Sequence, residues 1–344
     1  MNSDGKYIPQ LDFVRTVAVL LVFVGHLVHT LGFDRAVGTL AHFGVELFFI
    51  HTALVLFLSL ERIGGNFSVF YLRRAFRIYP LSIITVLLAL VFRVPATSWG
   101  AHYAWPGWLA VVSNLLLIQN LTGQTSIITV LWSLPVEVQM YVLLPALFLL
   151  YQCRVSVYII WIAFAGLAFA LPAVPQGDNF FLYGPCFCSG IIAYRVMKDG
   201  SSAISFRAMA YGLAGVILMN QVFALTRAPL AVSHSVVCIF AGLLIGRSRA
   251  PQTPAIRRLS AIIAKYSYGI YLSHVPLLWL CFRNKQGIPQ FAAFTVGAVV
   301  LPFLAFHLVE APLIRLGAAL TRPKSSNQEE TGTKNKSPFA TYAR

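Results

Sequence analysis

Long apolar segments alternate with short polar ones over most of the chain, and this pattern predicts a bundle of membrane helices. The leading segment, residues 11–31, is about 20 residues long and mostly apolar, which is enough to cross the hydrocarbon core of a bilayer as a helix. The apolar segments lie at about residues 11–32, 39–60, 78–93, 107–121, 131–151, 155–171, 180–196, 206–223, 230–246, 265–282 and 291–310. We therefore expect an all-α polytopic membrane protein.

Composition supports one integral membrane unit. The 344 residues are 58% hydrophobic and only 11% charged, whereas a soluble domain is about 25% charged. The net charge of +15 does not by itself indicate nucleic-acid binding, because the cytoplasmic loops of membrane proteins are basic. We expect a cytoplasmic lead over residues 1–10, an integral domain over 11–320 and a disordered cytoplasmic tail over 321–344.

The segment at 107–121 is short and is interrupted by Ser113, Asn114, Gln119 and Asn120. If it does not cross the membrane and the N-terminus is cytoplasmic, most of the 26 lysines and arginines fall on the cytoplasmic side. If it does cross, every later loop changes side and most of them fall outside. We therefore predict about ten transmembrane helices, both termini in the cytoplasm, and a re-entrant or partly buried segment at 107–121.

This topology predicts an acid–base layer inside the membrane. Counted along their spans, His26, Glu46, Glu137 and His274 all lie roughly 9–12 Å below the outer surface. A histidine beside a carboxylate is a common general base, because the carboxylate sets the tautomer and stabilises the imidazolium. We expect His26 to be the base, oriented by Glu46 or Glu137. The alternative is that these residues only form hydrogen bonds between helices.

A second polar group is predicted at the cytoplasmic ends of the spans. Arg15 lies eleven residues before His26 on the same helix face, roughly 16 Å away. Arg74 and Arg77 are three residues apart and share a face, and Glu310 ends the last span. Guanidinium groups bind phosphates in bidentate fashion, so these residues are candidates for a donor such as coenzyme A. Membrane anchoring by the arginines, and a plain helix end at Glu310, remain open.

The cysteines give no metal-binding signal. Cys186 and Cys188 are two residues apart, a spacing that matches neither a zinc site nor a redox pair. All five cysteines lie in or beside apolar segments. We expect them to act as small apolar residues, and we expect no metal cofactor.

Six segments together resemble the membrane-bound acyltransferase family 3, the bacterial polysaccharide and lipo-oligosaccharide O-acyltransferases. They occur in the family's order and are LDFVRTVAVLLVFVGHL (11–27), HFGVELFFIHTALVL (42–56), FYLRRAFRIYP (70–80), WSLPVEVQMYVLLP (132–145), YSYGIYLSHVPLL (266–278) and VEAPLIRL (309–316). His51 adds an unusual polar residue to the second segment. The resemblance implies a ten-helix core, cytoplasmic acetyl-coenzyme A as donor, a carbohydrate hydroxyl as acceptor, and roles for His26, Arg74, Arg77 and Glu310.

The expected function is thus an O-acyltransferase, most simply an O-acetyltransferase, in the bacterial inner membrane. Its partners would be the lipid bilayer and a carbohydrate or lipid-linked glycan, such as an exopolysaccharide or a lipopolysaccharide, with no nucleic acid. The alternative is a proton-coupled transporter or exporter, because buried histidine and glutamate residues also form proton relays.

Overall fold

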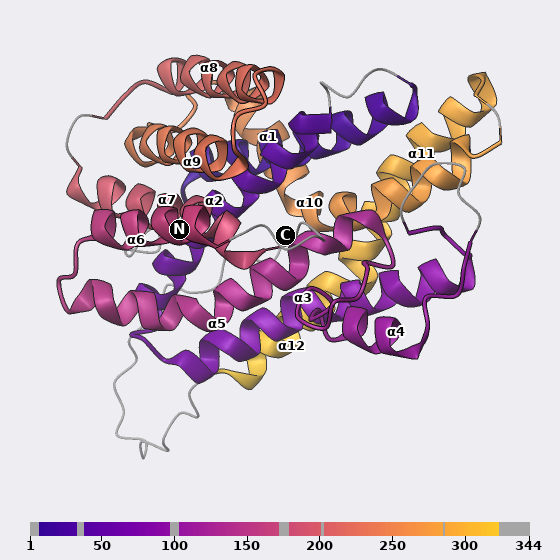
Figure 1. Ribbon diagram of the computed structural model, residues 1–344, viewed down its shortest axis with the longest axis horizontal. Coiled ribbons are helices and arrows are strands. Elements are labelled where there is room, and N and C mark those ends of the chain that lie inside the picture. The colour runs from indigo at the N-terminus through magenta and orange to yellow at the C-terminus, as the bar shows by residue number, and fades with distance from the viewer. Residues whose placement is uncertain are drawn as a thin grey trace, which may run out of the picture.

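The computed structural model describes residues 7–32, 38–96, 103–171, 179–200, 203–284 and 286–322, and within these ranges the chain is helical with no β-strand (Figure 1). The α-helices are α1 (Pro9–Thr30), α2 (Gly38–Arg62), α3 (Phe67–Val91), α4 (Trp108–Leu115), α5 (Ser133–Gln152), α6 (Val157–Ala170), α7 (Phe180–Asp199), α8 (Phe206–Leu225), α9 (Leu230–Arg247), α10 (Pro254–Phe282), α11 (Ile288–Leu304) and α12 (Ala311–Leu320). A 3-10 turn, η2 (Thr129–Trp132), precedes α5, and a π-helical turn, η3 (Ala305–Glu310), joins α11 to α12. The all-α prediction is confirmed.

Among the described residues, eight helical stretches are long and apolar enough to cross a bilayer. They are α1, α2, α3, η2 with α5, α7, α8, α9, and the continuous stretch from α11 to α12. Helix α6 is apolar but has 14 residues, and the 29-residue α10 is not among the eight. The protein is therefore a multi-pass membrane protein, while the count of ten spans is not confirmed. Residues 1–6 of the expected lead and 323–344 of the expected tail lie outside the described residues.

The segment predicted not to cross contains the short helix α4. Its eight residues extend about 12 Å, far less than the roughly 30 Å of a hydrocarbon core. Two of the polar residues that interrupt this segment hold it against residues 127–131, which precede α5. Asn114 accepts a hydrogen bond from the Ile127 amide at 3.0 Å, and Gln119 donates to the Leu131 carbonyl at 3.1 Å. Both side chains are buried, so their hydrogen bonds explain why polar residues occur here.

Helix α3 begins eleven residues before the apolar segment predicted for it. The Asn66 side chain caps its first turn by accepting from the Val69 amide at 3.1 Å. Arg74 and Arg77 therefore lie seven and ten residues after the first residue of the helix, roughly 10 and 15 Å along its axis. The sequence led us to expect them at a helix end, but they lie within the helix, and both are partly buried.

Helix α1 packs against α2 on one side and α10 on the other, and α2 also packs against α7 and α9. The approach of α1 to α2 depends on Gly44, where a Cβ atom would lie 2.7 Å from the Ala18 carbonyl oxygen. Small residues allow such close helix contacts in membranes. The N-terminal helix is thereby held against α2 and α10.

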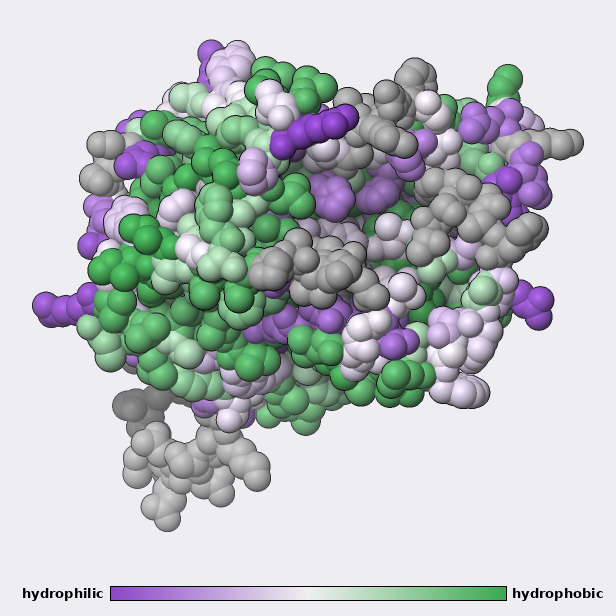
Figure 2. All heavy atoms as spheres, viewed as in Figure 1, coloured by the Kyte–Doolittle hydropathy of each residue, from purple (hydrophilic) through white to green (hydrophobic). Residues whose placement is uncertain are grey.

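The outside of the bundle is largely apolar. Hydrophobic side chains cover much of the visible face over α5 to α9, while several strongly hydrophilic side chains project at its left and right ends (Figure 2). Large exposed side chains include Val91, Trp108 and Leu308, each at least 70% exposed. Apolar surface of this extent is unusual in water and is expected where lipid covers a protein.

Candidate active site

A cavity of about 470 Å³ opens among α1, α2, α3, α5, α10 and η3. We call it the arginine cavity because Arg15, Arg74 and Arg77 line it together. The other polar side chains in its wall are Tyr7, Asp12, His51, Thr52, Ser133, Glu137, Tyr141, Lys265, Ser267, Tyr268, Tyr271 and Glu310. The four residues expected to bind the donor (Arg15, Arg74, Arg77 and Glu310) therefore share one cavity.

The three arginines differ in how they are held. The Arg15 Nε donates to the Ser267 hydroxyl at 2.5 Å, which ties α1 to α10. The Arg74 Nε is buried and has no hydrogen-bond partner among the described residues. The neighbouring Arg73 turns away from the cavity and donates to the Thr321 hydroxyl at 2.8 Å. A buried guanidinium nitrogen without a partner beside a cavity is suited to an anionic ligand.

Two carboxylates balance these cations. Glu137 accepts a hydrogen bond from the Tyr141 hydroxyl one turn later on α5, and Glu137 and Glu310 both interact electrostatically with Arg15. Glu310 lies in the π-helical turn and is 4% exposed, and its Oε1 has no hydrogen-bond partner among the described residues. π-Helical turns occur frequently at functional sites, because they redirect side chains within a helix.

The position of Glu137 corrects one prediction. The sequence placed it beside His26, but it lies in the arginine cavity with the groups expected at the cytoplasmic ends. The reason is the true length of α3. Because this helix begins at Phe67, Arg77 lies well inside the bundle and meets the first turns of the antiparallel α5.

Tyr7 and Asp12 line the cavity at the start of α1. Tyr7 precedes the helix and donates a hydrogen bond to the Asp12 carboxylate. Burial raises the pKa of the Tyr7 phenol above its ordinary value, and the hydrogen bond to Asp12 raises this pKa further. The phenol therefore stays a donor at neutral pH.

Tyr271 of α10 is part of the cavity wall. Its hydroxyl donates to the Val130 carbonyl at 2.8 Å and lies 2.6 Å from the Ser133 hydroxyl. The Phe48 ring meets the Tyr271 ring edge-on, with centroids 6.0 Å apart. On the next turn of α10, the His274 ring lies 6.1 Å from the Tyr271 ring.

His26 and His274 form a pair next to Tyr271. The His274 Nε2 lies 3.2 Å from the His26 Nδ1, and neither residue is part of the cavity wall. His274 is buried, whereas His26 is partly exposed. The structure thus brings together the two histidines of the predicted layer and separates them from its two carboxylates.

The position of Glu46 corrects the other part of the predicted acid–base layer, in which Glu46 was expected beside His26. Its Oε1 lies 3.2 Å from the His234 Nε2, and its Oε2 lies 3.5 Å from the Cys238 sulfur. Val45, Phe49 and Thr52 mark the side of α2 that faces the cavity. Glu46 points to another side because each residue turns a helix by about 100°. Counting residues gave a depth for Glu46, but it could not identify the neighbouring helix.

Sequence reasoning missed several side chains in the cavity wall, including His51, Tyr141 and Tyr268. His51 is 5% exposed and lines the cavity. In the sequence it was notable only as an unusual polar residue in an apolar segment. The Tyr268 hydroxyl donates to the Ile78 carbonyl at 2.8 Å. Tyrosines gave no signal, since hydroxyl residues commonly pack helices together in membranes.

The chain is similar to known acyltransferases. A family model described as "Acyltransferase domain" (Acyl_transf_3) matches residues 8–307. The protein named "Acyltransferase MdmB" of Streptomyces mycarofaciens is 26% identical over 361 residues, which cover 89% of each chain. No solved structure is significantly similar to the chain. Because the family model spans nearly all the described helices, the chain belongs to acyltransferase family 3 and is a membrane enzyme that transfers acyl groups.

Proposed function

We propose that the protein is an O-acetyltransferase that moves an acetyl group from acetyl-coenzyme A to a hydroxyl of a cell-surface or secreted carbohydrate. The observation that carries this proposal is the arginine cavity in a chain of the acyltransferase family. We further propose that the cavity opens to the cytoplasm, that both termini lie there, and that the membrane is the bacterial inner membrane.

The cavity suits the donor in size and charge. Its volume of about 470 Å³ lies within the roughly 300–1,000 Å³ typical of ligand pockets. In our proposal the phosphates of coenzyme A contact Arg74 and Arg77, and Arg15, held by Ser267, lies in the same cavity wall. The pantetheine arm then runs towards Tyr271, which places the thioester near the histidine pair.

The hydrogen bonds of the histidine pair support His26 as the base. The His274 Nδ1 lies 2.8 Å from the Tyr271 carbonyl and 3.1 Å from the Ile270 carbonyl, so it carries the proton. The His274 Nε2 is then an acceptor, and the His26 Nδ1 must be the donor that faces it and the Val22 carbonyl. The His26 Nε2 is left with a free lone pair.

The proposed reaction uses that lone pair. The acceptor hydroxyl gives its proton to the His26 Nε2 while its oxygen attacks the thioester carbonyl. The carbon–sulfur bond breaks, and the leaving thiolate takes the proton from His26. His274 takes the orienting role that we first gave to a carboxylate. For the thioester to reach His26, the hydrogen bond between Tyr271 and Ser133 must open.

Two measurements test the function. Mass spectrometry of surface and secreted glycans should show acetyl esters that disappear when the gene is deleted. The wild-type gene should restore these esters, and a His26→Ala gene should not. Membranes with the wild-type protein should release free thiol from acetyl-coenzyme A when acceptor glycan is present. Unchanged glycans, or substrate flux without thiol release, would contradict the proposal.

A further inference from the structure

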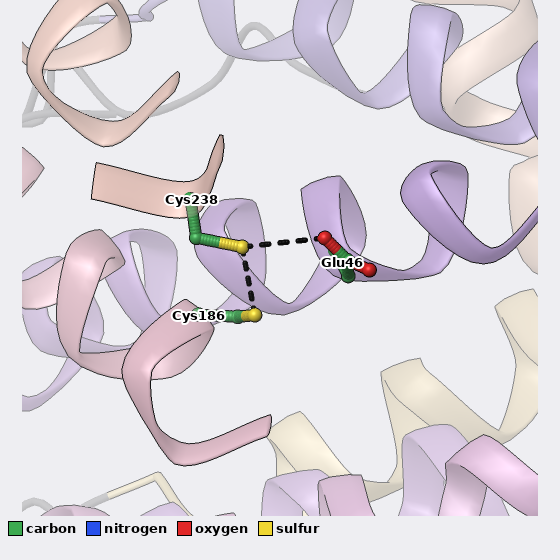
Figure 3. Close-up of side chains that lie close together, drawn as sticks. All are labelled: Glu46, Cys186 and Cys238. Atoms are coloured by element: carbon green, nitrogen blue, oxygen red, sulfur yellow. Dashed lines mark hydrogen bonds between the residues drawn. The ribbon is translucent and has the colours of Figure 1, made fainter. Parts of the chain in front are cut away.

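A second polar cluster lies inside the bundle and is not part of the arginine cavity. It consists of Glu46 on α2, Cys186 on α7, and His234 and Cys238 on α9, and we call it the Glu46 cluster. Each of these residues is at most 5% exposed. Figure 3 shows that the Glu46, Cys186 and Cys238 side chains converge from three helices.

The atoms of this cluster are close enough to share one ion. The ligand atoms of Glu46, Cys186 and Cys238 all lie within 4.8 Å of one another, and the two sulfurs are 2.7 Å apart. The His234 Nε2 adds a fourth atom 3.2 Å from the Glu46 Oε1. Tetrahedral zinc with bonds of about 2.0–2.3 Å needs ligand atoms roughly 3.3–3.8 Å apart. To reach that spacing the two sulfurs would separate by about 1 Å, and the His234 imidazole would turn from Glu46 towards the ion.

Charge is the second argument. Burying a carboxylate is costly unless it is paired or coordinated. Among the described residues, no lysine or arginine forms an ion pair with Glu46, and its neighbours are an imidazole and a thiol. His234 and Cys238 are four residues apart and so present their side chains on one face of α9. Thiolate, imidazole and carboxylate groups are all ligands that zinc takes in proteins.

We propose that the Glu46 cluster binds one zinc-like divalent cation with four protein ligands. The metal replaces the two thiol protons, which are released, and the site joins α2, α7 and α9. The sequence gave no sign of this site, because its two cysteines are 52 residues apart and metal motifs are recognised by local spacing. All four coordination positions are filled by protein, which fits a structural site and not a catalytic one.

The first test is metal analysis of the full chain purified in detergent from zinc-supplemented cells. We expect about one zinc per chain in the wild type, and loss of that zinc in Cys186→Ala and in Cys238→Ala. Cys188→Ala is the matched control, because Cys188 is buried two residues from Cys186 but is outside the cluster. This control should keep its zinc. A wild type without zinc, or a Cys186→Ala protein that retains it, would overturn the proposal.

A second test needs only the wild-type chain, in case the variants fail to fold. Protein from cobalt-supplemented cells should absorb in the near ultraviolet through thiolate-to-cobalt charge transfer. After denaturation with chelator and without reductant, all five cysteines should react as free thiols. Two missing thiols would show a disulfide between Cys186 and Cys238 and would overturn the metal site. Neither test uses acyl transfer, so its result is independent of the proposed function.

Discussion

Two polar regions lie on different sides of α2, and they differ in what their side chains face. In the arginine cavity, charged groups face an open space of about 470 Å³, and both the Arg74 Nε and the Glu310 Oε1 lack a hydrogen-bond partner among the described residues. In the Glu46 cluster, the functional atoms face one another at 2.7 to 3.5 Å. The first region has space for an anionic ligand, whereas the side chains of the second are in direct contact with one another.

The difference teaches that residue type and depth do not assign a role to a buried charge. Glu46 and Glu137 were predicted to share one layer, yet one lies beside a thiol and the other beside guanidinium groups. A buried polar group must be satisfied by some partner. Whether that partner is a neighbouring side chain or a ligand depends on the space around the group.

The largest effect is expected at the histidine pair, beyond the cavity. His26→Ala should lower acetyl transfer at least about 100-fold, because general bases contribute about 10²–10⁴-fold to rate. The KM for acetyl-coenzyme A should change little, since His26 is outside the cavity wall. Steady-state thiol release measures both quantities. His29→Ala, an exposed change one turn later on α1, is the control, and equal activity of the two variants would contradict the assignment.

A smaller effect is expected from the arginines. Arg74→Ala and Arg77→Ala should each lower kcat/KM for acetyl-coenzyme A by about 10- to 100-fold, since hydrogen bonds to charged groups contribute about 1.5–3 kcal/mol. Most of the loss should be in KM. Arg73→Ala is a matched control, because its side chain contacts Thr321 and not the cavity. A loss in Arg73→Ala as large as in Arg77→Ala would indicate a general need for positive charge and no specific donor site.

Glu46→Gln and Glu137→Gln test the comparison itself. Glu46→Gln should lower the melting temperature by a few degrees and weaken metal binding, because it disturbs a buried set of partners. It should leave the KM for the donor unchanged. Glu137→Gln should alter the KM and leave the metal content intact. Thermal unfolding, metal analysis and donor kinetics on both variants check this, and the same pattern in both would show that the two regions are not distinct.

The smallest effect is expected at Tyr271 in the cavity wall. Tyr271→Phe removes the hydroxyl that contacts Val130 and Ser133 while keeping the ring against Phe48. The rate of transfer should change by less than about 10-fold, because one hydrogen bond contributes about 1 kcal/mol net. If the proposed opening limits turnover, the change will be an increase. Single-turnover rates measure it, and a loss as severe as that of His26→Ala would mean that Tyr271 takes part in the chemistry.

The sequence by itself determined that this is a helical multi-pass protein with a short, non-crossing segment near residue 114. Hydropathy and length are local properties, and lipid imposes them on each helix separately. The sequence also selected the four residues that now share the arginine cavity. They could be found because arginines and glutamates are conspicuous in or beside apolar segments.

Only the tertiary structure decided which groups meet. In the structure His26 contacts His274, and Glu46 contacts His234 and Cys238. Glu137 lies beside the arginines of the cavity. Spacing along a helix gives the depth of a side chain in the membrane. It does not show which neighbouring helix that side chain faces. Those neighbours are set by close packing at positions such as Gly44, which a residue count does not reveal.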